Sequence, residues 1–130
     1  MSESELLSGV LELLQYLQNQ GKLVHMRLNS GSVIVPGKNK NYRIKLAPEG
    51  TADVLVIRKR DKRVSLMPKS DLLVSMPTTE ETQIYFIETK APDGGKQSDA
   101  QIKFQKQVEA QGAIYMLVKN LDTVIDEFTE

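Results

Sequence analysis

An aspartate and a Glu-x-Lys triplet, each next to an apolar segment, could together hold a metal ion beside a positive charge. Glu88 and Lys90 follow the apolar segment 84–87. Asp53 precedes a second apolar segment, 54–57. Both segments are typical of buried strands, in which alternate side chains face the same side of the sheet, so Glu88 and Lys90 are predicted to share a face. Two charges at the end of a core strand are costly to desolvate, and this cost indicates a chemical role.

These residue types suit metal-dependent hydrolysis of a phosphodiester. Mg²⁺ prefers oxygen ligands and retains several waters, so Asp53 and Glu88 are candidate metal ligands and the Thr89 carbonyl is a candidate third ligand. Lys90 could orient the attacking water or neutralise charge on the phosphate. Gln101 is expected in the first turn of the following helix, where its amide could hold a metal-bound water or a phosphate.

An ordinary structural explanation of the same residues remains open. Glu-x-Lys is frequent in charged chains and usually forms a solvent-exposed ion pair that contributes little to stability. The segment 50–53 could be a simple turn, and Gln101 could be a solvated helix residue. The spacing of these residues alone therefore leaves a metal site and a surface ion pair as alternatives.

The hydrophobic pattern predicts the helices and strands that would position these residues. Apolar residues at helical spacing predict helices over 2–20, 98–111 and 121–128. Strands are expected at 23–28, 32–35, 42–46, 54–57, 84–90 and 113–118. The charged segment 58–63 is expected to turn a hairpin, and 77–82 is expected to be a loop. This order predicts an α/β domain with a mixed central sheet flanked by helices.

Composition predicts one domain in a reducing compartment. The chain has 130 residues, of which 40% are hydrophobic, and this suffices for a single modest core. Because the chain has no cysteine, disulfides, zinc–thiolate sites and thiol nucleophiles are excluded. No apolar stretch approaches the ~20 residues that span a bilayer, and the acidic N-terminus is unlike a signal peptide. We therefore expect a cytoplasmic protein with no membrane partner.

Basic residues around a polar loop are the candidate contacts to a polyanion. They lie within or just after the loop 36–41, near the candidate aspartate, and are Lys38, Lys40, Arg43 and Lys45. Such residues could bind phosphates in a salt-dependent manner. The whole chain has 17 basic and 17 acidic residues, so it lacks the basic excess of many nucleic-acid-binding proteins. The second basic cluster, at 58–63, is expected to be a solvated hairpin tip.

A series of short motifs resembles the VRR-NUC family, a branch of the PD-(D/E)xK nuclease superfamily. In chain order the matching segments are 2–3, 27–31, 50–53, 87–90, 98–101 and 112–115. The resemblance implies a restriction-endonuclease-like core in one domain, 1–130, with a possible insertion at about 58–83. It implies an endonuclease that uses Mg²⁺ or Mn²⁺ to cleave branched DNA such as Holliday junctions. The short length resembles stand-alone members from phages and bacteria, which are associated with homodimers, and implies the host cytoplasm if a phage encodes the chain.

The resemblance also implies roles for individual residues. Asp53, Glu88 and Lys90 would form the catalytic core, with Gln101 as its helper. Two other functions stay open for such a chain. One is a non-catalytic DNA-binding accessory protein that retains the nuclease fold, and the other is a restriction-type nuclease with sequence specificity.

The family further has a glutamate on its first helix. Glu3 is the better match because it precedes Leu6 and Leu7 on the inward face, whereas Glu5 is expected on the opposite face. The sequence departs from the family at Ala52, where a proline usually precedes the catalytic aspartate. This change spares the aspartate itself.

Overall fold

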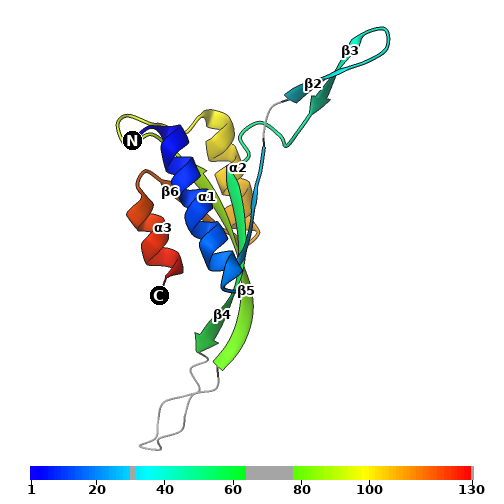
Figure 1. Ribbon diagram of the computed structural model, residues 1–130. Helices are drawn as coiled ribbons and strands as arrows, with labels where there is room; N and C mark the ends of the chain where they lie inside the picture. The colour runs from blue at the N-terminus through cyan, green and yellow to red at the C-terminus, as the bar shows by residue number, and fades with distance from the viewer. Residues whose placement is uncertain (30–31, 64–77, 130) are drawn as a thin grey trace, which may run out of the picture.

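The chain folds into a four-stranded mixed sheet with helices on both faces, and a separate two-stranded hairpin projects from it (Figure 1). The computed structural model describes residues 1–29, 32–63 and 78–129. In chain order the elements are α1 (Glu3–Asn19), β1 (Val24–Arg27), β2 (Ser32–Pro36), β3 (Asn41–Lys45), β4 (Val54–Arg63), β5 (Thr78–Thr89), α2 (Asp99–Ala110), β6 (Ile114–Val118) and α3 (Leu121–Phe128). None of the described helices is long and apolar enough to cross a bilayer.

The strand order confirms the predicted mixed sheet. The large sheet runs β1-β4-β5-β6. β1 and β4, and β4 and β5, pair antiparallel, whereas β5 and β6 pair in parallel. The parallel pair requires a crossover, and α2 supplies it. The loop 90–98 joins β5 to α2 and returns the chain to the sheet, so that the first turn of α2 lies close to the end of β5, where Gln101 hydrogen-bonds to Glu88.

The main core lies between the sheet and the two helices α1 and α3. The first helix begins with a capping box, in which the Glu5 N–H donates to Ser2 Oγ at 3.1 Å and the Ser2 N–H donates to the Glu5 carboxylate at 3.3 Å. Fully buried apolar residues on both sides of this layer are Leu6, Val10, Leu14, Val54, Val56, Tyr85, Ile87, Val118 and Val124. The opposite face of the sheet is covered by α2, where the rings of Phe86 and Phe104 lie 5.1 Å apart.

The two central strands extend further than the sequence predicted. The segment 58–63 was expected to turn a hairpin and 77–82 to be a loop, and both expectations were wrong for the described residues. Instead, 58–63 continues β4 and pairs antiparallel with 78–83 of β5. Both segments are rich in charged and polar residues, so the hydrophobic pattern gave no strand signal there. Most of the possible insertion, at 64–77, lies outside the described residues.

Arg58 is not a solvated charge, contrary to the expectation for its cluster. Its side chain is 12% exposed and forms an ion pair with Glu127 at 3.2 Å. The guanidinium carbon lies 5.0 Å from the Tyr85 ring centroid and 4.8 Å from that of Phe128. A planar guanidinium between two aromatic rings is a favourable cation–π arrangement. Arg58 therefore joins the end of α3 to the middle of the sheet.

Candidate active site

Asp53 and Glu88 meet where the two central strands end. The β4–β5 register pairs Val54 with Ile87, so the next step along the ladder places Asp53 opposite Glu88. The Asp53 carbonyl accepts a hydrogen bond from the Leu28 N–H at 2.8 Å, which continues the β1–β4 ladder and fixes the aspartate backbone. The fold thus brings together the aspartate and the Glu-x-Lys triplet, although they are far apart in the sequence.

Glu88 is a buried carboxylate with one hydrogen-bonded oxygen and one unpaired oxygen. The residue is 3% exposed. Its Oε1 accepts a hydrogen bond from Gln101 Nε2 at 2.6 Å, and Lys90 Nζ lies 3.9 Å from the same atom. Its Oε2 is buried and has no hydrogen-bond partner among the described residues. A buried carboxylate oxygen without a partner is rare and costly, and it fits the ligand atom of a bound cation.

The surroundings of Glu88 oppose its negative charge. Burial raises the pKa of Glu88 to about 7, and the nearby negative charges of Asp53 and Glu3 also raise it. The positive charge of Lys90 acts in the opposite direction but does not cancel these effects. A divalent cation bound between the carboxylates would favour the ionised form of Glu88. The residues present therefore fit a metal ion.

Thr89 holds Asp53 in place through two hydrogen bonds. The backbone N–H and the hydroxyl of Thr89 both donate to Asp53 Oδ2, each at 2.8 Å. Thr89 is 1% exposed, so this contact is shielded from water. Because both bonds use Oδ2, the role of metal ligand would fall to Oδ1. The sequence suggested only the Thr89 carbonyl as a ligand, which stays a prediction, and it did not reveal the positioning role of the hydroxyl.

Lys90 lies beside Glu88, as the alternation of strand side chains predicted. The Lys90 side chain is 14% exposed. The backbone N–H of Lys90 donates to the Val118 carbonyl at 2.9 Å, and this hydrogen bond fixes the end of β5. The following loop folds back closely over this residue at Gly95. A Cβ at Gly95 would lie 2.8 Å from the Ala91 carbonyl oxygen and 2.9 Å from Lys90 Cβ. Only glycine allows the loop this approach.

Gln101 links the start of α2 to Glu88. Its side-chain Oε1 accepts from the Ser98 N–H at 2.9 Å while its Nε2 donates to Glu88 at 2.6 Å. The Gln101 N–H donates in turn to Ser98 Oγ at 3.2 Å, which completes a capping box. Gly50, with φ of +90°, lets the turn before Asp53 pack against this helix, because a Cβ there would lie 2.4 Å from the Ala100 carbonyl oxygen. Gln101 is thus a bridging residue and not a solvated one.

The glutamates of the first helix differ in their relation to the site. Glu3 is exposed, yet its charge contributes to the raised pKa of Glu88. Glu5 instead caps its own helix through Ser2. Within the described ranges, no three Asp, Glu, His or Cys side chains lie close enough together to bind a metal ion as a group. The structure therefore brings together two carboxylates, and a ligand role for Glu3 stays a prediction.

Tyr115 and Gln97 lie beside the site and were not predicted. The β5–β6 register pairs Tyr115 with Phe86, on the same face as Glu88. Gln97 Nε2 donates to the Tyr115 hydroxyl at 3.2 Å and to Gln105 Oε1 at 2.9 Å. Burial raises the pKa of Tyr115 to about 12, and the charge of Glu88 contributes to this rise. In the sequence, a tyrosine within an apolar strand gives no signal that separates this position from a core residue.

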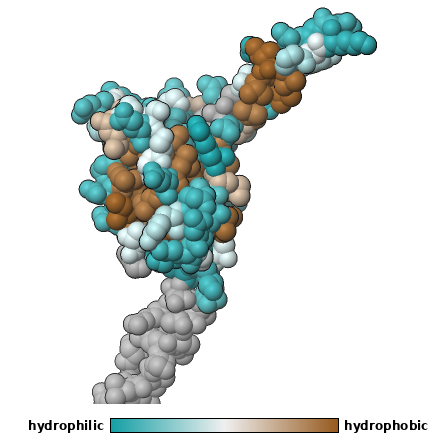
Figure 2. All heavy atoms as spheres, viewed as in Figure 1, coloured by the Kyte–Doolittle hydropathy of each residue, from teal (hydrophilic) through white to brown (hydrophobic). Residues whose placement is uncertain are grey.

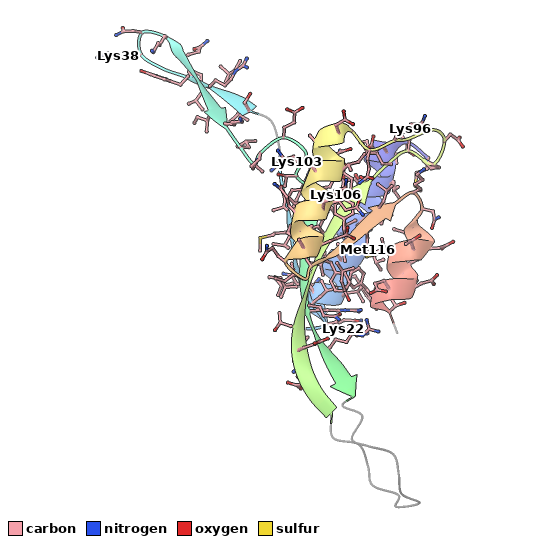
Figure 3. All side chains as sticks on the ribbon, turned by 180° about the vertical axis from the view of Figure 1, so that it is seen from behind. Lys22, Lys38, Lys96, Lys103, Lys106 and Met116 are labelled. Atoms are coloured by element: carbon pink, nitrogen blue, oxygen red, sulfur yellow. The ribbon has the colours of Figure 1, made fainter. Side chains whose placement is uncertain are left out.

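The four candidate DNA-binding residues do not lie beside the aspartate, contrary to our expectation. Lys38, Lys40, Arg43 and Lys45 are carried by the β2–β3 hairpin, which projects away from the sheet (Figure 1). Figure 3 shows Lys38 at the far end of this hairpin, well separated from Lys96 and Met116 on the body. Among the described elements, β2 and β3 contact only each other. The basic residues therefore form a separate region of the molecule.

Comparison with known proteins does not add to this geometry. Neither a protein family, nor a curated protein, nor a solved structure matches the chain. The resemblance to the VRR-NUC family, and the roles that it implies, therefore stay predictions. The contacts of the site residues are the observations from which a function is argued.

Proposed function

We propose that this protein is a metal-dependent endonuclease with a restriction-endonuclease-like core that cleaves phosphodiester bonds in branched DNA. The observation that carries the proposal is the buried, unpaired Oε2 of Glu88. It belongs to a carboxylate that faces Asp53 across two strand ends and has Lys90 Nζ 3.9 Å from its other oxygen. A surface ion pair, the alternative from sequence, would leave both partners exposed, and here both are largely buried.

The two carboxylates are the residues that would hold Mg²⁺ or Mn²⁺. Asp53 Oδ1 and Glu88 Oε2 are the oxygens not committed to Thr89 and Gln101. When bound, the ion would lower the pKa of a water molecule and offset charge on the phosphate. Two carboxylates and several waters are a common ligand set for Mg²⁺, which often keeps part of its hydration shell.

The remaining residues of the site position groups and balance charge. Lys90 has its ammonium on the same face as Glu88, so it can orient the attacking water or offset negative charge that develops on the phosphate. Gln101 fixes the orientation of Glu88 through the 2.6 Å hydrogen bond from its amide. Thr89 fixes Asp53 in the same way. Carboxylates that are already oriented before the substrate reacts need no reorganisation during the reaction, which lowers its barrier.

A cleavage assay with matched variants tests this proposal. Wild-type protein is incubated with labelled duplex, flap and four-way-junction DNA, with and without Mg²⁺ or Mn²⁺. We expect metal-dependent nicking of branched DNA by the wild type, and no nicking by Asp53→Ala or Lys90→Ala although both still bind the DNA. Glu12→Ala and Lys22→Ala are the controls, because both residues are exposed and neither lies on β4, β5 or α2, the elements that carry Asp53, Glu88, Lys90 and Gln101.

The outcomes separate the alternatives. Retained cleavage of the junction by both site variants would contradict the mechanism. Binding of branched DNA without any metal-dependent nicking by the wild type would favour a non-catalytic accessory protein. Cutting of plain duplex at one defined sequence would favour a restriction-type nuclease. An independent readout is thermal stability, since Mn²⁺ should raise the Tm of the wild type and not that of Glu88→Gln.

A further inference from the structure

Positive charge is concentrated on the β2–β3 hairpin. We call the segment 32–45, which forms β2, β3 and the loop between them, the arm. The arm contains four basic residues and no acidic residue, whereas the whole chain has 17 of each. The rest of the chain is therefore left with 13 basic and 17 acidic residues, an excess of negative charge. A basic segment on an otherwise acidic molecule indicates a polyanionic partner.

Both faces of the arm are open to such a partner. Every residue of its two strands is exposed, and the strands contact only each other among the described elements. Asn41, Arg43 and Lys45 alternate along β3, so their side chains share one face of the ribbon. Within the described ranges, none of the four basic residues of the arm forms an ion pair. Their charges are thus available to an external anion.

The tip of the arm carries the other two basic residues. Lys38 and Lys40 lie in the loop between the strands, and Figure 3 shows Lys38 at its far end. This loop is tight, because a Cβ at Gly37 would collide with the Tyr42 ring and the Lys40 carbonyl. Lys40 Nζ lies 5.3 Å from the centroid of the same ring. Figure 2 shows hydrophilic residues over the whole tip, so the arm presents charge along its length up to its end.

The base of the arm is fixed beside the candidate aspartate. The Leu28 N–H donates to the Asp53 carbonyl at 2.8 Å, and the Ala47 N–H donates to the Asn29 carbonyl at 2.8 Å. Lys38 follows ten residues after Leu28, so the tip lies at most about 34 Å from Leu28. This distance is about one turn of B-form DNA. A duplex held by the arm is therefore held within about one helical turn of the site.

We propose that the arm lies in the major groove of a DNA duplex and holds that duplex beside the site. The choice of DNA among polyanions rests on the proposed function. The face with Asn41, Arg43 and Lys45 turns towards the DNA, because arginine and asparagine suit contacts to base edges and lysine suits contacts to phosphates. Lys38 and Lys40 contact phosphates at the end of the arm.

The dimensions and composition of the arm favour this groove over other nucleic-acid surfaces. The major groove of B-form DNA is about 12 Å wide and admits a two-stranded ribbon, whereas the minor groove is about 6 Å wide. The major groove of an RNA duplex is too narrow for side chains to enter. Single strands bind largely by stacking on aromatic side chains. The arm has one aromatic residue, Tyr42, and its ring already packs against Gly37.

Binding titrations without divalent metal test the role of the arm. A duplex of about two helical turns is titrated at several salt concentrations. Arg43→Gln/Lys45→Gln should lower affinity by about four- to tenfold and the slope of log affinity against log salt by about one to two.

The matched control is Lys22→Gln/Lys59→Gln, which removes the same charge and should change affinity by less than about twofold. Lys22 and Lys59 are exposed and line one hollow, and Figure 3 shows Lys22 at the opposite end of the body from Lys38. Equal losses from the two double variants would overturn the proposal. An RNA duplex bound as tightly as DNA, with the same dependence on the arm, would also overturn it.

Methylation by dimethyl sulfate identifies the groove. The reagent modifies guanine N7, which lies in the major groove, and adenine N3, which lies in the minor groove. We expect the wild type to protect guanine N7 over several base pairs of one branch of a four-way junction, and Arg43→Gln/Lys45→Gln to lose this protection. Protection of adenine N3 alone, or guanine protection that the double variant retains, would contradict the proposal.

These experiments need neither metal nor cleavage, so the role of the arm and the nuclease activity fail or succeed separately. Arm-dependent groove protection by a wild type that never nicks DNA would support the arm and contradict the nuclease. Metal-dependent nicking, with DNA affinity that the arm variant leaves unchanged, would do the reverse.

Discussion

The site at the ends of β4 and β5 and the β2–β3 arm use charged residues in opposite ways. At the site, each carboxylate accepts a hydrogen bond from a specific neighbouring residue. Thr89 donates to Asp53, and Gln101 donates to Glu88. On the β2–β3 hairpin, the four basic residues are exposed, and one of them, Lys40, lies with its Nζ 5.3 Å from the centroid of the Tyr42 ring. A buried polar contact depends on single atoms, whereas exposed charges act additively and are screened by salt. Changes at the site should therefore have large, specific effects, and changes on the arm should have small, cumulative ones.

The largest expected effect comes from removing the charge of one buried carboxylate. Glu88→Gln keeps the shape of the side chain and can still accept from Gln101, but it cannot supply an anionic oxygen. We expect cleavage of a four-way junction to fall by on the order of a thousandfold or more, with DNA affinity nearly unchanged. Single-turnover cleavage and a binding titration measure the two quantities. If Glu88→Gln lost DNA affinity by as large a factor as cleavage activity, the site would act in DNA binding and not specifically in cleavage, which would contradict the expected difference between the site and the hairpin.

The second effect is a pH dependence of stability. The pKa of Glu88 is raised to about 7 in the folded protein from an ordinary value of 4.5, so the folded state binds this proton more tightly than the unfolded state. Stability from this group is therefore present below about pH 4.5 and is lost as pH rises towards 7, by up to roughly 3 kcal/mol. Chemical denaturation at several pH values, without divalent metal, should show Glu88→Gln gaining stability relative to wild type across this window. An equal pH profile for both proteins would contradict the burial argument.

A smaller effect is expected from the hydroxyl that positions Asp53. Thr89→Val keeps the side-chain volume and the backbone hydrogen bond but removes the 2.8 Å bond from Oγ1 to Oδ2. We expect about a tenfold fall in kcat with little change in KM, as a loss of positioning by one hydrogen bond predicts. Thr82→Val is the control, because Thr82 is exposed on the same strand. If both variants lose activity equally, the effect belongs to the strand and not to the hydrogen bond.

The smallest effect is expected from single changes on the arm. Lys45→Gln should weaken DNA binding by about two- to threefold and should lower the slope of log affinity against log salt by about one. Lys22→Gln is the control, since Figure 3 shows Lys22 on the body at the opposite end from Lys38. Binding titrations at several salt concentrations measure both quantities. A fall in DNA affinity of about a hundredfold from Lys45→Gln alone would contradict the expectation that single charges on the hairpin have small effects.

The sequence predicted the elements of the site better than the contacts within it. Side-chain alternation placed Glu88 and Lys90 on one face, and the helix start near Ser98 placed Gln101 close to them, because both depend on local periodicity. The hydrogen bonds from Thr89 to Asp53 could not be predicted, since they depend on strand register and on the side-chain rotamer of Asp53. Local patterns fix which face a residue occupies but not which atom it contacts.

The arm and the long central strands show a second limit of the sequence. Strands were expected at 32–35 and 42–46, and β2 and β3 are present there with bounds that differ by one residue. Nothing in the sequence pattern of these segments indicates that the two strands pair only with each other. The segment 58–63 shows the opposite error: it is part of β4, but its charged side chains gave no strand signal in the sequence. In both cases tertiary pairing, which is not local, decides the outcome.

The Arg58 contact has a consequence for how the molecule opens. Its guanidinium donates to the Glu127 carbonyl at 2.9 Å and to the Tyr85 hydroxyl at 3.0 Å, so the last turn of α3 and the two central strands share one largely buried cation. Fraying of α3 would leave this cation without half of its partners, which is costly in the interior. The C-terminal helix and the middle of the sheet should therefore open together as one cooperative unit, with similar protection of their amides from hydrogen exchange. A helix end that would normally fray is thereby tied to the centre of the sheet.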